Sequence, residues 1–349
     1  MNQKRFASLL IAALVVNCGA FYLSSRRNLH ADTHGAALLP TLATELDTVT
    51  QVRVRKGAAD PAVTLHRSGA GQWLLAQRDD YPADVSKLRK LLIALGDAKI
   101  TEEKTSDPAN YSIIGVEDPT KPGATGAELT VTAKDGTHAV IVGKPVGEGD
   151  FVRRAGEAQS FVVEPAITVE AEPRSWIDSR LIDIPATSIQ SVEVKLATGA
   201  AYTVRRLKPN EDGFALEAVP AGRKPLEAKA LAPSASTLSA VTAEDVAAAG
   251  TIDFGKPDQA TLTLADGSVL SITGAQVAEK RWIEIKSSKD AALSAKTQNR
   301  AFEIATYRYD ALFRPLEQLL VPKETKPPAA PAAKPAAKPA VKSAPAPAP

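Results

Sequence analysis

The sequence predicts an α+β protein: an N-terminal transmembrane helix, then two similar antiparallel-sheet-plus-helix repeats, then a disordered Pro/Ala/Lys tail. Three observations support this. An apolar run stands near the start, similar segments recur in the same order about 140 residues apart, and Pro, Ala and Lys dominate the end. The expected boundaries are a cytoplasmic end at 1–5, a membrane span at 6–23, a linker at 24–40, repeats at 41–180 and 181–322, and a tail at 323–349.

Composition and charge describe a globular body between two basic ends. The 349 residues are 44% hydrophobic and 23% charged, as in ordinary globular proteins. The net charge is +2, but residues 1–30 and the tail from Lys323 each carry +4, so the body between them carries −6. A nucleic-acid-binding protein needs a basic face. We therefore expect no nucleic-acid partner.

The start of the chain predicts one membrane crossing. Lys4 and Arg5 precede an apolar run from Phe6 to Leu23, which ends at Ser24-Ser25-Arg26-Arg27. Its 18 residues are just enough for a helix to cross the hydrocarbon layer. Once the α-amine is counted with Lys4 and Arg5, positive charge is slightly greater on the N-terminal side, which favours a body outside the cytoplasm. We interpret the run as an uncleaved signal anchor in a bacterial inner membrane, with the body in the periplasm.

Two other interpretations of this run stay open. Cys18-Gly19-Ala20 offers small residues at the spacing of a signal-peptide cleavage site. A lipoprotein would need a small residue before Cys18, and Asn17 is a poor one. Cys18 is the only cysteine in the chain, so the body has neither a thiol nor a disulfide.

Four pairs of segments recur in the same order and predict the two repeats. They are "QVRVRK" at 51–56 with "SVEVKL" at 191–196, "GQWLLAQ" at 71–77 with "DGFALEA" at 212–218, and the longer pairs 135–154 with 266–285 and 160–177 with 301–319. The first pair alternates apolar and polar residues, as half-buried strands do. Asp-Gly at 135–136 and 266–267 predicts a tight hairpin turn in each repeat, because both positions tolerate positive φ.

A helix is predicted in each repeat after the first strands. Leucines at 88, 91, 92 and 95 form one apolar stripe, with Lys87, Arg89 and Lys90 facing away. Pro82 suits a helix start and Gly96 a helix stop. The second helix, at 226–241, contains Pro233 and should start late or break.

The stretch "GVEDPTKP" at 115–122 predicts a bend rather than a catalytic loop. Asp107 followed by Pro108 should cap a short helical turn that ends at Gly115, and Asp118-Pro119 should then interrupt the chain before a strand. A similar bend is expected in the second repeat, in "AAGTIDFGKPDQATLTL". The stretch therefore joins a helical turn to the strands that follow.

These segments together resemble a known family. "WLL", "YPAD", the leucine helix, "YSIIGVEDP", "VIVGKP", "FVRR" and "FVV" are similar to the domain of unknown function 4340 family, best over about residues 45–185. Ser-Ile-Ile between Tyr111 and Gly115, and Val116-Glu117 in place of Leu-Asp, depart from its pattern. The resemblance implies a membrane-anchored envelope protein, often encoded beside an ABC-transporter permease, and it brings no catalytic residues.

A search for catalytic, cofactor and metal sites gives none. The four histidines (30, 34, 66 and 138) lack a Glu or Cys partner at metal-site spacing. Proline follows both Gly143-Lys144 and Gly255-Lys256, where a phosphate loop needs Ser or Thr. We interpret the remaining candidates as solvated or core residues: the acid pairs 79–80, 102–103 and 117–118, the arginine pairs 153–154 and 205–206, and the tryptophans 73, 176 and 282.

The sequence therefore favours a protein without enzyme activity or cofactor. The expected role is an accessory or scaffold component of an ABC-type transport system. The expected partners are the membrane, through one spanning helix, and an ABC-transporter permease or another envelope protein. One alternative is a periplasmic module that binds a glycan, peptide or lipid. A second is an enzyme whose site has no familiar motif.

Overall fold

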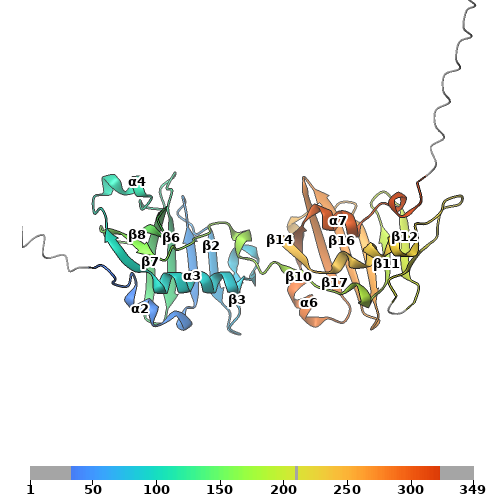
Figure 1. Ribbon diagram of the computed structural model, residues 1–349, viewed down its shortest axis with the longest axis horizontal. Coiled ribbons are helices and arrows are strands. Elements are labelled where there is room, and N and C mark those ends of the chain that lie inside the picture. The colour runs from blue at the N-terminus through green and yellow to red at the C-terminus, as the bar shows by residue number, and fades with distance from the viewer. Residues whose placement is uncertain (1–32, 209–210, 323–349) are drawn as a thin grey trace, which may run out of the picture.

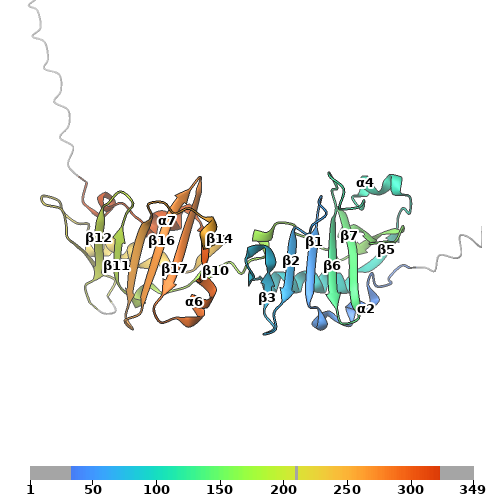
Figure 2. The ribbon, with the colours of Figure 1, turned by 180° about the vertical axis from the view of Figure 1, so that it is seen from behind.

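The computed structural model describes residues 33–208 and 211–322. It contains two antiparallel sheets of nine strands each, which lie next to each other along the longest axis of the molecule (Figures 1 and 2). Helices are few, so the predicted α+β class is confirmed. The apolar run at 6–23 and the tail at 323–349 lie outside the described residues. Within the described ranges, no helix has the length and apolarity needed to cross a membrane.

The first sheet is built from residues 51–164 in the order β4-β3-β2-β1-β6-β7-β8-β9-β5. Its strands are β1 (Gln51–Arg55), β2 (Val63–Arg67), β3 (Trp73–Leu75), β4 (Tyr81–Pro82), β5 (Lys99–Glu103), β6 (Ala127–Ala133), β7 (Gly136–Val146), β8 (Gly149–Arg154) and β9 (Ser160–Glu164).

The second sheet is built from residues 180–304 in the order β10-β14-β18-β17-β16-β15-β11-β12-β13. Its strands are β10 (Arg180–Ile182), β11 (Ile189–Lys195), β12 (Ala201–Arg206), β13 (Phe214–Glu217), β14 (Val241–Ala248), β15 (Asp258–Leu264), β16 (Val269–Val277), β17 (Lys280–Ser287) and β18 (Arg300–Ile304).

Eight strands of each sheet follow the same order. The series β3-β2-β1-β6-β7-β8-β9-β5 has its counterpart in β13-β12-β11-β15-β16-β17-β18-β14, and only β4 and β10 fall outside it. The segment pairs found in the sequence lie on matching strands, for example 51–56 on β1 and 191–196 on β11. Both Asp-Gly turns join neighbouring strands, β6 to β7 and β15 to β16, as predicted.

The α-helices are α2 (Pro40–Ala43), α3 (Val85–Asp97), α4 (Tyr111–Ile114), α5 (Ala228–Leu231), α6 (Ala291–Thr297) and α7 (Thr306–Leu312). Short 3₁₀ turns are η1 (Leu46–Thr48), η2 (Ala76–Arg78), η3 (Pro108–Asn110), η4 (Pro173–Trp176), η5 (Ala186–Ser188), η6 (Ala232–Leu238), η7 (Ala249–Thr251) and η8 (Leu316–Leu319). The helix predicted at 226–241 does break: α5 gives way to η6 one residue before Pro233.

Helix α3 lies across one face of the first sheet (Figure 1), and its leucine stripe at 88, 91, 92 and 95 is buried as predicted. Its predicted start was wrong. Pro82 lies on β4, where it pairs with Leu74 of β3. The helix instead starts after Asp84, whose side chain accepts a hydrogen bond from the Lys87 amide. The helix ends at Asp97, one residue past the predicted stop at Gly96, and Gly96 is buried where a Cβ would lie 2.8 Å from the side chain of Leu46.

The bend at 115–122 has the predicted structure. Asp107 caps η3, and α4 ends at Gly115 with φ of 76°. Asp118 then accepts hydrogen bonds from the amide and hydroxyl of Thr120, and Glu117 accepts them from Thr125. The two acids therefore hold the loop that leads from α4 to β6.

Candidate functional site: a groove beside helix α3

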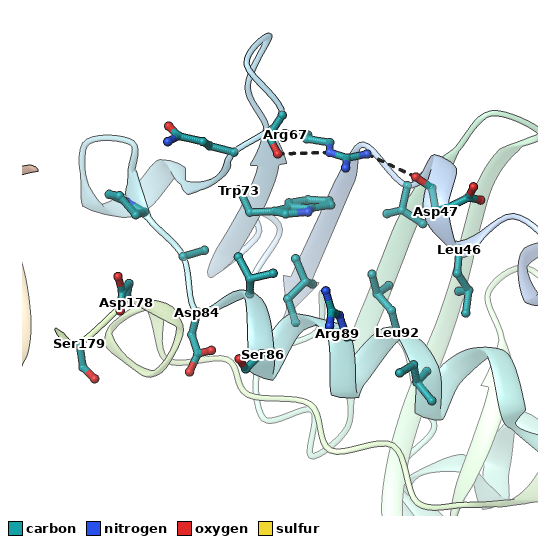
Figure 3. A pocket seen from close by; sticks show the side chains of 18 of the residues that line it. Leu46, Asp47, Arg67, Trp73, Asp84, Ser86, Arg89, Leu92, Asp178 and Ser179 are labelled. Carbon is teal, nitrogen blue, oxygen red and sulfur yellow. Dashed lines mark hydrogen bonds between the residues drawn. The ribbon is translucent and has the colours of Figure 1, made fainter. Parts of the chain in front are cut away.

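A groove of about 900 Å³ lies beside α3 (Figure 3). Five segments form it: η1, the β2–β3 hairpin, residues 82–84, α3 and the connector between the sheets at 178–180. Its apolar lining includes Leu46, Trp73, Val85, Leu92 and Ile93. The groove therefore combines parts of the chain that lie more than 130 residues apart.

The outward face of α3 supplies the exposed apolar surface of the groove. Val85, Arg89 and Ile93 follow each other at four-residue intervals and so share one face of the helix. Val85 is 44% exposed and Ile93 is 48% exposed, although both are large and apolar. Adjacent to this stripe, Leu92 is buried against the core. The helix therefore packs its leucine stripe inward and presents a second, smaller apolar stripe to the groove.

Trp73 forms the opposite wall. Its half-buried indole lies between the Arg67 side chain and α3 (Figure 3). Arg67 donates hydrogen bonds to the carbonyls of Gly71 and Asp47, at 3.4 and 3.3 Å. These bonds hold the arginine stem above the ring. An aromatic face beside an apolar helix stripe is suited to packing against a flat or elongated apolar group.

Charged side chains of both signs surround the apolar floor. Arg67, Arg89 and Arg180 stand among Asp47, Asp84 and Asp178. Burial would raise the pKa of Asp178, but hydrogen bonds from Lys296 and Arg180 outweigh it and hold that pKa below its usual value. Asp178 is therefore ionised near neutral pH, and the rim is mixed in charge rather than a site for one kind of ion.

The histidines do not assemble into a site. His66 lies on β2, 3.4 Å from a carboxylate oxygen of Asp80, and His138 lies on β7, 2.9 Å from Asp135. His34 precedes α2 and lines a different cavity. Among the residues that the structure describes, no group of three or more His, Cys, Asp or Glu side chains could hold a metal ion.

The two Gly-Lys motifs have structural roles. Gly143 lies on β7, where it presses against the bend that follows α4, and the Lys144 amine donates to the Ile113 carbonyl at 2.7 Å. Gly255 adopts a φ of 46°, and its amide is bonded to Asp253. Both glycines are therefore used for close packing or for a left-handed turn.

The acid pairs have other partners. Glu102 pairs with Lys104, and Glu103 accepts a hydrogen bond from Thr33. Hydrogen bonds from Thr120 lower the pKa of Asp118. Burial alone would raise the pKa of Glu117, but hydrogen bonds from Thr125 outweigh burial, so this pKa is lowered as well. Asp79 and Asp80 both adopt positive φ and form a bend at the junction between the sheets.

The prediction for the arginine pairs was half wrong. Arg154 and Arg205 make surface ion pairs, with Glu157 and Glu217. Arg153 and Arg206 are instead buried. Each donates to backbone carbonyls and stacks 4.6 Å from an aromatic ring, Tyr111 and Phe214 respectively. A buried guanidinium requires such partners, because it keeps its charge.

Sequence reasoning missed the groove. Trp176 and Trp282 are buried core residues as predicted, but Trp73 is half-buried and lines the groove. A signal was present in the sequence: Val85 and Ile93 lie outside the leucine stripe of α3, on the face assigned to Arg89. Two apolar residues on the solvent side of a helix mark a second contact surface.

Comparison with known families matches residues 73–267 to the Domain of unknown function (DUF4340). The chain belongs to this family. The match starts at Trp73 and ends in the β15–β16 turn, so it begins later than the expected position 45 and extends well beyond 185. The DUF4340 region therefore includes α3, the connector and parts of both sheets. No curated protein and no solved structure matches the chain.

Proposed function

We propose that this DUF4340 protein is a non-enzymatic, membrane-anchored envelope protein that holds a partner in the groove beside α3. The partner we propose is a component of an ABC-type transport system, so that the protein acts as an accessory or scaffold. The observation that carries the proposal is the exposed apolar stripe of Val85 and Ile93 opposite Trp73. Exposed apolar surface around an aromatic residue is typical of protein contact sites.

The size of the groove indicates a weak contact that needs a tether. Covering the exposed half of Val85 or Ile93 contributes about 1 kcal/mol each, and an aromatic anchor such as Trp73 adds about as much again. A few kcal/mol corresponds to a dissociation constant in the millimolar range at best. Confinement at one membrane supplies an effective concentration on the order of millimolar. The groove and the membrane anchor are therefore complementary parts of the proposal.

The anchor proposed for this role is the apolar run at 6–23, with residues 1–5 in the cytoplasm and the body in the periplasm of a bacterium. Its support is the length of the run and the charge on its N-terminal side. We further propose that residues 41–180 and 181–322 are copies of one ancestral unit. The shared order of eight strands supports this duplication.

A periplasmic binding module is the second candidate function. The observation that favours it is the Trp73 ring beside a rim of arginines and aspartates. Sugar rings and extended peptides both use an aromatic surface for packing, with polar groups at its edge that fix their orientation. In this case the groove would hold a small ligand rather than a transporter component.

Site-specific photocrosslinking distinguishes these possibilities. A photoreactive phenylalanine analogue replaces Ile93 in the anchored chain, and the matched control carries it at Ile113, an isoleucine of α4 that is 65% exposed and outside the groove. We expect an adduct with a transporter component from position 93 and none from position 113. Equal adducts from both positions would refute the groove as the contact site. An adduct of position 93 with a glycan or peptide would favour the second candidate.

A further inference from the structure

The connector between the two sheets is bonded to both of them. On the first-sheet side, the Asp178 amide donates to the Pro82 carbonyl at 2.8 Å, and the Tyr81 hydroxyl donates to the Asp178 carbonyl at 3.2 Å. On the second-sheet side, the Lys296 amine lies 3.0 Å from the Asp178 carboxylate, and the Ala243 amide donates to the Ser179 carbonyl at 2.8 Å. Asp178 is therefore bonded to β4 of the first sheet and to Lys296 of α6 in the second half, and its neighbour Ser179 is bonded to β14.

A second set of contacts joins η2 and the turn after it to the second sheet. Arg78 makes a two-bond pair with Asp245 of β14, at 2.6 and 3.1 Å, and both side chains are largely buried. Arg300 of β18 donates to the Asp79 carbonyl at 2.7 Å. Paired N–H donors facing a carboxylate fix orientation as well as distance. We call these contacts and those of Asp178 the joint.

Tyr81 occupies the centre of the joint. It is fully buried, its ring meets that of Phe302 of β18 edge-on at 5.7 Å, and the cations of Lys296 and Arg300 lie 5.7 and 5.6 Å from its centroid. Burial raises the pKa of its hydroxyl, which therefore remains a hydrogen-bond donor. The joint thus combines apolar packing, ion pairs and directed hydrogen bonds.

The joint and the groove share residues. Asp178, Ser179 and Arg180 form one wall of the groove. Trp73, on the opposite wall, accepts a hydrogen bond at its carbonyl from Ala83, two residues after Tyr81. A rotation of one sheet relative to the other must strain Asp178 or carry it away from α3, because it is bonded to both sides. Movement at the joint therefore changes the shape of the groove.

We infer that the joint is a conformational device that couples the relative orientation of the two sheets to occupancy of the groove. This rests on the proposed function in one respect only, namely that the groove is the site that a partner occupies. Coupling of this kind is reciprocal. A partner that fits the groove as observed holds the sheets in their present orientation, and a change in orientation weakens the fit.

The coupling is tested without any ligand. The full chain carries Cys18→Ser for clean labelling, fluorotryptophan at its three tryptophans, and spin labels at Thr137→Cys in the first sheet and Ser271→Cys in the second. Arg78→Gln breaks the joint from the first sheet, and Asp245→Asn breaks it from the second. Arg205→Gln, which breaks the surface pair with Glu217, is the matched control. Trp73→Phe assigns the groove signal in the fluorine spectrum.

We expect either joint variant to broaden the distribution of distances between the spin labels and to shift the Trp73 fluorine signal by more than its width. The far-ultraviolet circular dichroism of both variants should match that of the parent chain, which shows that the sheets are folded. The control should change neither quantity. A broadened distribution with an unmoved Trp73 signal in both variants would disprove the coupling, and an unchanged distribution would disprove the joint itself. Both results are independent of the crosslinking outcome, so failure of the coupling is distinguishable from failure of the proposed function.

Discussion

Replacing Gly143 by alanine adds one methyl group where β7 crosses the bend after α4. The new Cβ would lie 2.3 Å from the Ile114 carbonyl oxygen and 2.9 Å from a methyl carbon of Val116, whereas real Cβ atoms essentially never come closer than 3.0 Å to such neighbours. The strand or the bend must therefore move apart by at least about 0.7 Å. The contact atoms at Ile114 and Gly115 belong to the backbone, so a change of side-chain rotamer cannot relieve the clash.

The expected cost follows from two effects. Overpacking of a well-packed site costs about 1–3 kcal/mol, and separating the bend from β7 also weakens the Lys144 bond to Ile113, worth about 1 kcal/mol. We expect Gly143→Ala to lower the free energy of unfolding by about 3 kcal/mol. For a unit of about 150 residues or more, this corresponds to a fall in melting temperature of about 6–12 °C.

The assay is urea and thermal unfolding followed by circular dichroism. Gly69→Ala, in the β2–β3 turn of the first sheet, is the matched control, because Gly69 has no heavy atom within 4 Å of its added Cβ and no positive φ. The stability of this control should be unchanged or slightly raised. If Gly143→Ala unfolds with the same midpoint as the control, the packing explanation is wrong. If phosphate stabilises the parent chain but not the Gly143 variant, the motif would instead be a phosphate-binding loop.

Three further predictions concern the joint, a buried arginine and the tether. The pKa of Asp178 is lowered, because bonding to Lys296 outweighs burial. Its contribution to the free energy of unfolding is therefore present at neutral pH and is lost as pH falls below about 4. Asp178→Asn should flatten the dependence of melting temperature on pH in that range. Arg206→Ala should cost about 3 kcal/mol by leaving buried carbonyls without donors, whereas Arg205→Ala should leave the urea midpoint unchanged. Exchange of residues 1–28 for a cleavable signal peptide should severely impair cellular function in a complementation test, whereas function should survive alanine at His66, His138, Glu117 or Asp118. Full complementation by the released body, together with loss of function from one of those alanines, would indicate an enzyme.

Local chemistry explains which elements the sequence could predict. The leucine spacing of α3, the Asp-Gly turns and the Asp107 cap depend on residues close together in the chain. The predicted start of α3 was wrong for a tertiary reason, and Gly96 has a tertiary role that its place near the helix end did not reveal. Pro82 pairs with Leu74 across a strand contact, and Gly96 is required by the approach of Leu46 from a distant turn. Neither partner can be inferred from the pattern of the helix alone.

The groove was beyond prediction for the same reason. Its walls come from Leu46, Trp73, the face of α3 and the connector at 178–180, and only the fold brings these together. Arg153 and Arg206 are a related case, since a strand-end arginine looks like a solvated residue until the loop that supplies its carbonyls is placed. The exposed apolar pair on α3 could have been noticed, but not what lies opposite it.

Each sheet uses one uninterrupted stretch of chain, residues 51–164 and then 180–304. Every strand of the first sheet is therefore synthesised before the first strand of the second. Domains generally fold as units, the N-terminal one first during synthesis. The first sheet can therefore pair all its strands before the second sheet is complete. Arg78 and Tyr81, in contrast, meet their partners only after β14 and β18 of the second sheet have been synthesised. Until then these residues, and the apolar surface around them, are a place where a chaperone can bind the unfinished chain.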